Sequence, residues 1–572
     1  MTQATPPMVR QVSMRCARGA WLAGLLLAVL VALQPAAARD TAGGAVATAH
    51  PIATRVGEAI LAQGGNAFDA AVAVSAALGV VEPYASGIGG GGFLLLHRAS
   101  DRFEVMVDAR EAAPARASAD MYLGPDGRVV PNASTFGARA AAIPGLPAGL
   151  VHVSRKYGRL PLATALAPAI RLARDGFAAD GRYVLLTGLR LAGLREGIRT
   201  AEVFLDGGSV PAAGFIVRQP DLARTLEALV AGGADGFYRG PVAQALIAGV
   251  QAAGGIWEPS DLADYRVIER EPTRIWFRGA SITMASLPSS GGATLAQALQ
   301  ILDRLPRPPP GTPDQAHLVI EALRRGFEDR LRHLGDPDQS AIPVARLVDP
   351  GYARERAAAI DPARATSVPA LPEPAPAGGS DTTHFSIVDR DGNRVGGTLS
   401  INTLFGACVI PAGTGVLLNN EMDDFTIHPD AGNSYRLRTG SANAIAPRRR
   451  PLSSMTPTFV EDARGALVLG SPGGSRIISQ VLLAVLDHLD RPEVDLVRTV
   501  SLPRYHHQFW PDEVEIEPTG FAADWIVALE RKGHRVTRVR RQWGNMQAVF
   551  RDARSGTARA ASDPRGIGVA WY

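Results

Sequence analysis

Apolar and polar positions alternate along this chain with periods that predict both helices and strands. A helix is expected over residues 66–81, where Asn66 can cap an Ala/Val/Leu-rich run and Asp69 falls in the first turn. A glycine-rich turn over 82–92 then leads into Phe93-Leu94-Leu95-Leu96, which is typical of a buried strand. Three further segments have helical patterns: 162–175, 220–231 and 317–333.

The pattern changes abruptly near residue 381. Residues 357–380 are rich in Pro, Ala and Gly with little periodicity, which predicts a flexible linker. Residues 382–389 (TTHFSIVD) then predict a strand, Asp391-Gly392-Asn393 a turn, and 395–401 a second strand. A hairpin therefore begins where a loose linker ends.

The first 38 residues have the pattern of a secretory signal peptide. Arg10, Arg15 and Arg18 precede an apolar run over 21–33, and small residues at 36–38 suit cleavage. The run is short for a membrane span, which needs about 20 residues, although an uncleaved anchor is the alternative. We therefore expect an exported, soluble mature protein without a stable membrane span, located in a bacterial periplasm or secreted.

Composition narrows the range of functions. The chain has 572 residues, of which 46% are hydrophobic and 20% charged, as in ordinary globular proteins. Its net charge of +4 comes from scattered arginines rather than a basic stripe with aromatic partners, which argues against a nucleic-acid partner. With Cys16 in the signal peptide, Cys408 alone remains, which excludes an intrachain disulfide and a multi-cysteine metal site.

Two familiar motifs have ordinary explanations. Gly87, Gly89 and Gly92 match G-x-G-x-x-G, but a dinucleotide loop follows a strand and opens a helix, whereas here a helix precedes and a strand follows. We expect a tight turn packed near an active site. His506-His507 suggests a metal only weakly, because adjacent side chains on a strand point apart, so a structural role is preferred and no metal is expected.

Thr382 is the most promising candidate for chemistry. A threonine hydroxyl is a weak nucleophile that needs an adjacent base. If the chain were cut between Asp381 and Thr382, the new α-amino group, with a pKa of about 7.7–8.0, would lie on the same residue as the hydroxyl and could serve as that base. The tripeptide Thr382-Thr383-His384 taken alone fits an ordinary strand equally well.

Three later segments strengthen this hypothesis. Asp424 ends a polar cluster that follows an apolar stretch, and Ser453-Ser454 comes after an arginine-rich loop. The backbone of Gly473-Gly474 could direct two N–H donors toward a developing oxyanion. Each segment could be a simple turn, but together they indicate a site.

The chain as a whole resembles the γ-glutamyltransferases (γ-glutamyl transpeptidases), members of the N-terminal nucleophile hydrolase superfamily. Beyond the segments after Thr382, the matching stretches are Gly64-Gly65-Asn66-Ala67, Glu82-Pro83, Ser86 to Phe93, Asp108-Ala109-Arg110-Glu111, Pro144-Gly145, 167–170, 288–292 and Gly335-Asp336-Pro337.

The resemblance implies an α+β fold, a four-layer αββα sandwich made by two subunits of one precursor. Self-cleavage between Asp381 and Thr382 would give a large subunit, 39–381, and a small catalytic subunit, 382–572, which stay together as a heterodimer. Thr382 would attack the γ-amide of glutathione or another γ-glutamyl compound. Water, or an amino-acid or peptide acceptor, would release the acyl group, and no cofactor is implied.

The resemblance also implies roles for individual residues. Arg110 would bind the glutamyl α-carboxylate with help from Ser453 and Ser454, while the α-ammonium group would lie among Asp424, Glu421 and Asn402. The remaining roles are Gly473 and Gly474 as the oxyanion hole, Thr383 and Ser400 as neighbours that position Thr382, and Tyr435 as a residue of a lid loop.

Several positions depart from the family pattern. Tyr84 and Ala85 stand where His and Ser are common, Ala112 replaces a frequent threonine, and Ser400 keeps the hydroxyl of a common threonine. Arg436 replaces the glycine after the lid tyrosine, which bears on lid shape and acceptor preference.

Two alternatives remain. A glutaryl or cephalosporin-type acylase of the same fold would not need the acidic groups Asp424 and Glu421, since glutaryl lacks an α-amino group. A non-catalytic exported binding protein would have no use for Thr382.

Overall fold

Two antiparallel sheets form the centre of the unit made by residues 40–572. The computed structural model describes residues 1–2, 44–368, 382–428 and 430–571. Nearly all of the predicted signal peptide, and Asp381 of the predicted cleavage site, lie outside these described residues.

The first sheet has seven strands and the second has six. In spatial order the first contains β18 (Val569–Trp571), β1 (Gly44–Thr48), β9 (Thr383–Asp389), β10 (Arg394–Ser400), β2 (Gly91–Arg98), β3 (Phe103–Ala109) and β6 (Ile268–Arg270). The second contains β17 (Ala558–Ser562), β16 (Gln547–Asp552), β12 (Gly465–Gly470), β11 (Thr458–Asp462), β8 (Ala280–Met284) and β7 (Thr273–Phe277).

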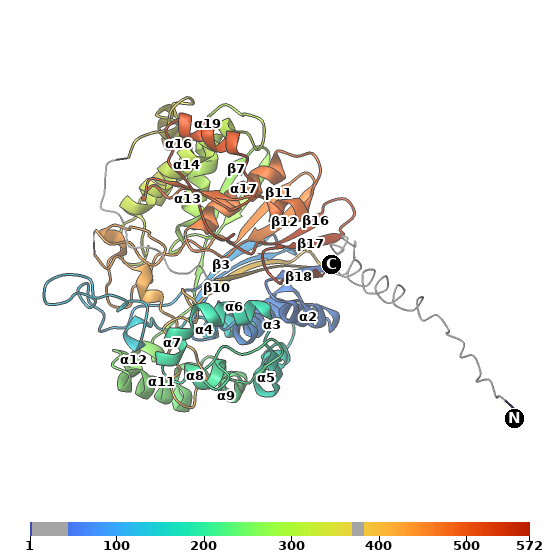
Figure 1. The fold of residues 1–572 in the computed structure, drawn as a ribbon, viewed down its shortest axis with the longest axis vertical. Coiled ribbons are helices and arrows are strands. Elements are labelled where there is room, and N and C mark those ends of the chain that lie inside the picture. The colour runs from blue at the N-terminus through green and yellow to red at the C-terminus, as the bar shows by residue number, and fades with distance from the viewer. Residues whose placement is uncertain (3–43, 369–381, 429, 572) are drawn as a thin grey trace. The chain divides into compact units, whose positions relative to one another are not determined.

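Helices cover the outer face of each sheet, so the unit has four layers (Figure 1). On the first sheet lie α2 (Pro51–Ala62), α3 (Ala67–Val81), α4 (Leu146–Tyr157) and α5 (Leu162–Asp175), with α6 (Gly181–Leu189), α7 (Leu191–Glu196), α8 (Thr200–Phe204), α9 (Pro220–Gly232), α10 (Asp235–Tyr238), α11 (Gly240–Ala252) and α12 (Pro259–Ala263) beyond them. The second sheet carries α13 (Ser290–Leu302), α14 (Pro313–His333), α15 (Val344–Leu347), α16 (Pro350–Ala358), α17 (Arg476–Leu489), α18 (Leu496–Ser501) and α19 (Ala523–Arg531). The predicted α+β fold is confirmed, and its layers have the expected αββα order.

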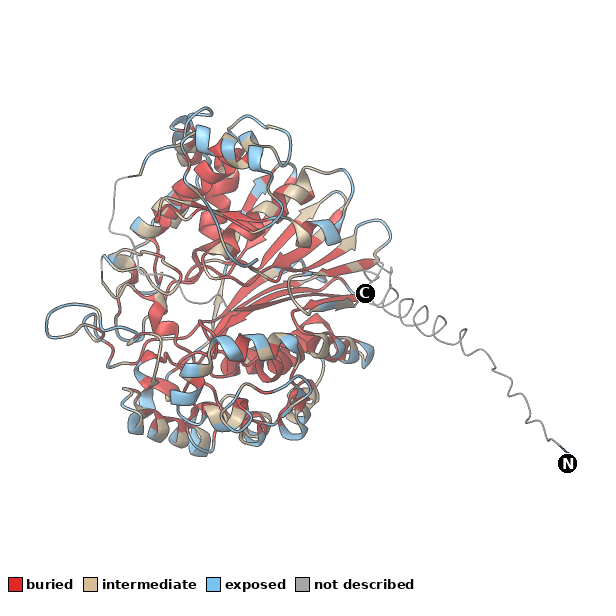
Figure 2. Cartoon of the chain, viewed as in Figure 1, coloured by how far each residue is buried: buried red, intermediate tan, exposed pale blue. Residues whose placement is uncertain are grey.

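The alternation of side chains along β2 explains how the layers pack. Leu94 and Leu96 belong to the hydrophobic cluster under α2–α5, whereas Phe93 and Leu95 belong to the cluster shared with the second sheet. Successive side chains on a strand point to opposite faces, so a sheet covered on both sides needs a continuous apolar run. Figure 2 shows the resulting buried interior of both sheets.

The helices predicted from sequence are present. The 66–81 segment forms α3, where Asn66 and Asp69 make a reciprocal capping box. The other three predicted helices correspond to α5, α9 and α14, and the hairpin to β9 and β10. The predicted strand at 93–96 is longer than expected, because β2 pairs along Gly91–Arg98 with both β10 and β3.

The first part of the predicted linker is held in place. Ala357 belongs to α16, the Ala365 N–H donates to the Lys532 carbonyl, and the Thr366 hydroxyl donates to Glu321 at 2.6 Å. Hydrogen bonds of the backbone and of capping side chains can hold a segment in place even when its sequence has little periodicity. A hydrophobic pattern does not reveal such bonds, so the sequence predicted a flexible linker here. The remainder, 369–381, lies outside the described residues.

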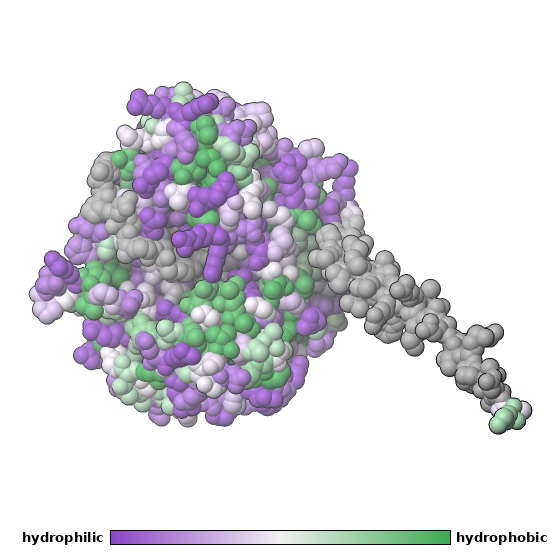
Figure 3. All heavy atoms as spheres, in the orientation of Figure 1, coloured by the Kyte–Doolittle hydropathy of each residue, from purple (hydrophilic) through white to green (hydrophobic). Residues whose placement is uncertain are grey.

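Smaller features complete the unit. Two minor sheets consist of β13 (Tyr505–His506), β14 (Val514–Ile516) and β15 (Val536–Arg538), and of β4 (Phe177–Ala178) and β5 (Ile216–Val217). Leu185 and Leu189 of α6 are about half exposed, and Figure 3 shows apolar side chains gathered on the surface in the region of α6. Among the helices of the described segments, none is both long and apolar enough to cross a membrane.

Candidate active site

Thr382 lies immediately before β9, beside the last residue of the neighbouring strand. Its hydroxyl oxygen is 3.3 Å from that of Ser400, and its exposed fraction is 8%. The next side chain, Thr383, points to the other face and donates a hydrogen bond of 2.8 Å to Glu82. The hairpin register therefore fixes both predicted neighbours of the threonine, one beside it and one behind it.

A small pocket opens at Thr382. Its walls include nine of the residues predicted to form the site: Thr382, Ser400, Asn402, Glu421, Asp424, Tyr435, Ser453, Ser454 and Gly474. Arg330, Leu437, Leu452, Met455, Ser475 and Ile477 complete the wall. The free space is only about 20 Å³, close to that of one water molecule, so a larger ligand can enter only if part of the wall moves.

Arg110 lies behind this wall rather than on it, and is fully buried at the end of β3. Its Nη1 donates to Glu421 and its Nη2 to Asp424 at 2.6 Å, while Nε donates to the Pro451 carbonyl at 3.1 Å. The predicted cation and the two predicted acids are thus brought together, but in a mutual ion-pair network.

Glu111 adds a third carboxylate to this network. It is fully buried, lies 3.5 Å from Arg110 Nη1, and neither of its oxygens has a hydrogen-bond partner among the described residues. Burial raises the pKa of Glu111 to about 7 and also raises the pKa of Glu421 well above its ordinary value. One guanidinium thus faces three carboxylates, which makes this end of the pocket acidic.

The two candidate oxyanion glycines both have left-handed backbones, with φ of 134° at Gly473 and 57° at Gly474. A Cβ at Gly474 would lie 2.3 Å from the Tyr435 ring, so only glycine fits beneath that ring. Within the described part of the chain, neither N–H donates a hydrogen bond. Both donors are therefore available to a ligand, although Gly474 alone of the two lines the pocket.

Tyr435 closes the pocket from above Gly474. Its hydroxyl donates to the Asn402 carbonyl at 2.7 Å, and Gln508 donates to the carbonyls of Tyr435 and Arg436. Arg436 adopts a left-handed φ of 60° and pairs with Glu513 at 2.5 Å. The arginine thus occupies the conformation that a glycine adopts most readily.

Sequence reasoning missed Arg330, and it gave no role to Glu82 or Glu111. Arg330 follows Leu323 and Phe327 at spacings of seven and three, which places it on the buried face of α14. That spacing was the available signal for Arg330. Nothing in the sequence distinguishes Glu82 from a helix-capping glutamate.

The motifs that were set aside have structural roles. A Cβ at Gly89 would lie 2.0 Å from the Leu417 carbonyl oxygen, and one at Gly92 would lie 2.2 Å from that of Thr398. This confirms the tightly packed turn. His506 bonds to Ser479 and Gln508, and His507 to Asp512, so the adjacent histidines have separate partners.

One cluster among the described residues has metal-like spacing, namely His317, Glu321 and His534. His317 Nδ1 and His534 Nε2 are hydrogen-bonded at 2.8 Å. Glu321 pairs with Arg324 and Arg325. Both nitrogens of His317, Nε2 of His534 and the Glu321 carboxylate are thus engaged by protein groups.

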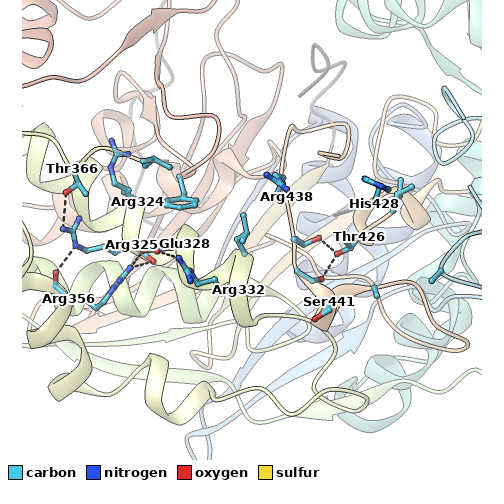
Figure 4. A pocket seen from close by; sticks show the side chains of 18 of the residues that line it. Arg324, Arg325, Glu328, Arg332, Arg356, Thr366, Thr426, His428, Arg438 and Ser441 are labelled. Atoms are coloured by element: carbon cyan, nitrogen blue, oxygen red, sulfur yellow. Dashed lines mark hydrogen bonds and ion pairs between the residues drawn. The ribbon is translucent and has the colours of Figure 1, made fainter. Parts of the chain in front are cut away.

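A larger cavity of about 900 Å³ lies between α14 and the segment 426–441 (Figure 4). Its wall contains Arg324, Arg325, Arg332 and Arg356 beside apolar groups such as Phe509. Arg325 donates to Thr366, and Arg332 and Arg356 both pair with Glu328. With Arg438, the wall holds five arginines against two acidic residues, Asp120 and Glu328.

The four-layer sandwich, with a threonine hydroxyl at the start of a central strand and open backbone donors nearby, defines the N-terminal nucleophile hydrolase class. Comparison with known proteins is more specific. The family model described as gamma-glutamyltranspeptidase matches residues 53–572. The chain belongs to the γ-glutamyltranspeptidase family.

Similar proteins include the glutathione hydrolase proenzyme of Pseudomonas sp. (strain A14), 43% identical over 86% of this chain and 86% of that protein. The glutathione hydrolase proenzyme of Escherichia coli (strain K12) is 38% identical over 92% of this chain and 90% of its own length. Among solved structures, cephalosporin acylase from Bacillus halodurans covers 94% of this chain and 98% of its own, with a TM-score of 0.81 and 26% identity.

Proposed function

We propose that this chain is a self-processing γ-glutamyltransferase and glutathione hydrolase with Thr382 as its nucleophile. The observation that carries the proposal is that Thr382 opens onto the same small pocket as Glu421, Asp424 and the two serines. A γ-glutamyl group has a reactive carbonyl at one end and an ammonium and a carboxylate at the other, and the pocket offers a partner for each.

The pocket residues divide by charge. Glu421 and Asp424 receive the α-ammonium group, together with the Asn402 side-chain oxygen, because its amide nitrogen already donates to the Asn420 carbonyl at 3.0 Å. Ser453 and Ser454 donate to the α-carboxylate, with Arg110 supplying positive charge from behind. Tyr435 covers the bound group.

The reaction is an acyl transfer through an ester. The α-amino group freed at Thr382 takes the hydroxyl proton as the oxygen attacks the γ-carbonyl, and the amide nitrogen leaves with that proton. Gly473 and Gly474 donate to the oxyanion. Thr383 and Ser400 position the nucleophile. Water, or the amine of an amino acid or peptide, then attacks the ester and regenerates the hydroxyl.

Processing precedes catalysis. Cleavage between Asp381 and Thr382 gives a large chain, 39–381, and a small chain, 382–572, which remain associated as a heterodimer. Removal of residues 1–38 accompanies export to a bacterial periplasm. Glutathione is the expected donor.

An acylase that accepts glutaryl-type side chains is the second candidate, and the likeness to cephalosporin acylase favours it. The acidic end of the pocket favours the first. One guanidinium, that of Arg110, faces three buried carboxylates. Burying the excess carboxylates is costly without a further cation, and a glutaryl group brings none.

Purified protein on a denaturing gel tests the processing step. Wild type should give two bands and Thr382→Ala one. Turnover of γ-glutamyl and glutaryl p-nitroanilides then separates the two candidates, because a site built for an ammonium group should favour γ-glutamyl by orders of magnitude. Equal rates would reject the first candidate, and an uncut wild-type protein would reject both.

A further inference from the structure

Arg330 reaches the pocket from α14, whereas Arg110 lies at the end of β3. Arg330 is 2% exposed and contributes to the wall together with Thr382, Ser453 and Ser454. Arg110 is fully buried behind the wall. Of these two arginines, it is therefore Arg330 that a ligand in the pocket would meet directly.

The hydrogen bonds of Arg330 are few for a buried guanidinium. Nε donates to the Ser290 hydroxyl at 2.9 Å and Nη2 to the Ser454 hydroxyl at 3.4 Å. Nη1 has no hydrogen-bond partner among the described residues, and no carboxylate of those residues lies within ion-pair distance. Burial lowers the pKa of Arg330 to about 10, although the nearby charge of Asp424 opposes this shift, so Arg330 remains charged at neutral pH.

A buried charge without a counter-ion is costly. Arg110 shows the usual solution, since Glu421, Asp424 and Glu111 surround it. Within the described segments, Arg330 bonds only to serine hydroxyls, and its Nη1 has no hydrogen-bond partner there. An anion supplied by the substrate would satisfy it.

The two arginines therefore bring different partners to the pocket. Arg110 lies among up to three negative charges, whereas Arg330 bonds to the hydroxyls of Ser290 and Ser454 and has Asp424 as a nearby but unpaired charge. An α-amino acid head group has the matching polarity, with its ammonium toward the acids and its carboxylate toward Arg330.

We propose that Arg330 is a carboxylate-binding and specificity-determining residue, which contacts the substrate α-carboxylate through Nη1 and orients the Ser454 hydroxyl toward it through Nη2. This inference rests on the proposed function and extends it. It assigns the recognition of the carboxylate to a second cation, and it restricts the acyl group to those that carry an anion at the end remote from the scissile amide.

Three p-nitroanilides test this assignment in processed Arg330→Gln. The γ-glutamyl anilide has both head groups, the glutaryl anilide lacks the ammonium group, and the 4-aminobutyryl anilide lacks the carboxylate. Loss of hydrogen bonds to a charged group should lower kcat/KM for the first two by roughly 10- to 100-fold. The 4-aminobutyryl anilide should change less than about 3-fold, since it offers Arg330 nothing to bind.

Two matched variants sharpen the comparison. Asp424→Asn should show the complementary pattern, with losses for the γ-glutamyl and 4-aminobutyryl anilides and little change for glutaryl. Arg325→Gln removes another buried arginine of α14 that pairs with Glu321 away from this pocket, and it should not discriminate among the substrates. Arg330→Lys keeps the charge but not the planar fork, and should lose less than Arg330→Gln.

Equal losses of Arg330→Gln on all three anilides would overturn the proposal. So would a failure of both Arg330→Gln and Arg330→Lys to be processed, because the arginine would then serve folding or cleavage. Failure of the wild type to turn over γ-glutamyl anilide would instead reject the proposed function itself.

Discussion

The hydroxyl oxygens of Thr382 and Ser400 lie 3.3 Å apart, one at the start of β9 and the other at the end of β10. The pairing of these strands therefore sets the position of the nucleophile. We expect Ser400→Ala to slow both self-cleavage and turnover by about 10-fold. This is the effect of losing one hydrogen bond that holds the Thr382 hydroxyl in position. Ser400→Thr keeps a hydroxyl and should remain near wild type. The time course of band intensities on a denaturing gel measures self-cleavage, and the turnover of γ-glutamyl p-nitroanilide measures catalysis. Unchanged rates in Ser400→Ala would contradict the role of Ser400 in positioning Thr382.

Gly474 lies directly beneath the Tyr435 ring, with a left-handed φ of 57°. Gly474→Ala would place a methyl group 2.3 Å from that ring and displace an oxyanion donor, so kcat should fall by roughly 10²-fold.

Two variants separate the clash from backbone strain. Gly207 has nearly the same φ, 55°, but open space around it, so Gly207→Ala should leave kcat unchanged. In a Tyr435→Ala background the cost of Gly474→Ala should shrink, since the two changes share one contact. Strict additivity would show that the ring is not what excludes a side chain.

Glu111 should make stability depend on pH. Burial raises its pKa from 4.5 to about 7. Below pH 4.5 both the folded and the unfolded chain hold this proton, so the group imposes no penalty. As pH rises to 7, Glu111 releases its proton first in the unfolded chain. The free energy of unfolding therefore falls by up to roughly 3 kcal/mol.

Glu111→Gln removes this titration. The drop in Tm between pH 5 and pH 7.5 should therefore be smaller in Glu111→Gln than in wild type. Glu530→Gln, an exposed glutamate of α19, should behave as wild type. Identical Tm profiles in all three proteins would show that Glu111 is ionised in the folded state.

Arg436 combines a left-handed backbone with an ion pair to Glu513. Arg436→Gly and Arg436→Ala both remove the ion pair, but only glycine adopts the left-handed region without strain. Arg436→Ala should therefore be less stable than Arg436→Gly by about 1 kcal/mol in thermal unfolding. Glu513→Gln removes the ion pair but keeps Arg436, so its stability measures the contribution of the ion pair alone. Equal stability of Arg436→Gly and Arg436→Ala would show that the left-handed backbone at this position is not strained.

Local patterns were sufficient for much of the fold. The α3 capping box, the amphipathic helices and the β9–β10 hairpin depend on residues close in the chain, so their spacing in the sequence reports them. The order of the strands could not be predicted in this way, because β1 pairs with β9 and β18 across hundreds of residues.

The site shows the same division. Thr382, Glu421 and Asp424 lie in distinctive local segments, and the structure places them on one pocket. Arg330 lies among other arginines of α14, and its neighbours Ser290 and Ser454 come from distant segments. Its distinguishing feature is that no carboxylate in the described part of the chain forms an ion pair with it, which only the folded chain shows.

The sheets interleave strands from both sides of the Asp381–Thr382 bond. In the first sheet β1 lies between β18 and β9, and β10 pairs with β2, while in the second β8 pairs with β11. If that bond is cut, no strand loses a partner, and the two chains cannot separate without dissolving both sheets. Unfolding, however, would release two molecules instead of one. Refolding would then be a bimolecular reaction whose yield falls on dilution, so the persistence of the processed enzyme would depend on how slowly it unfolds.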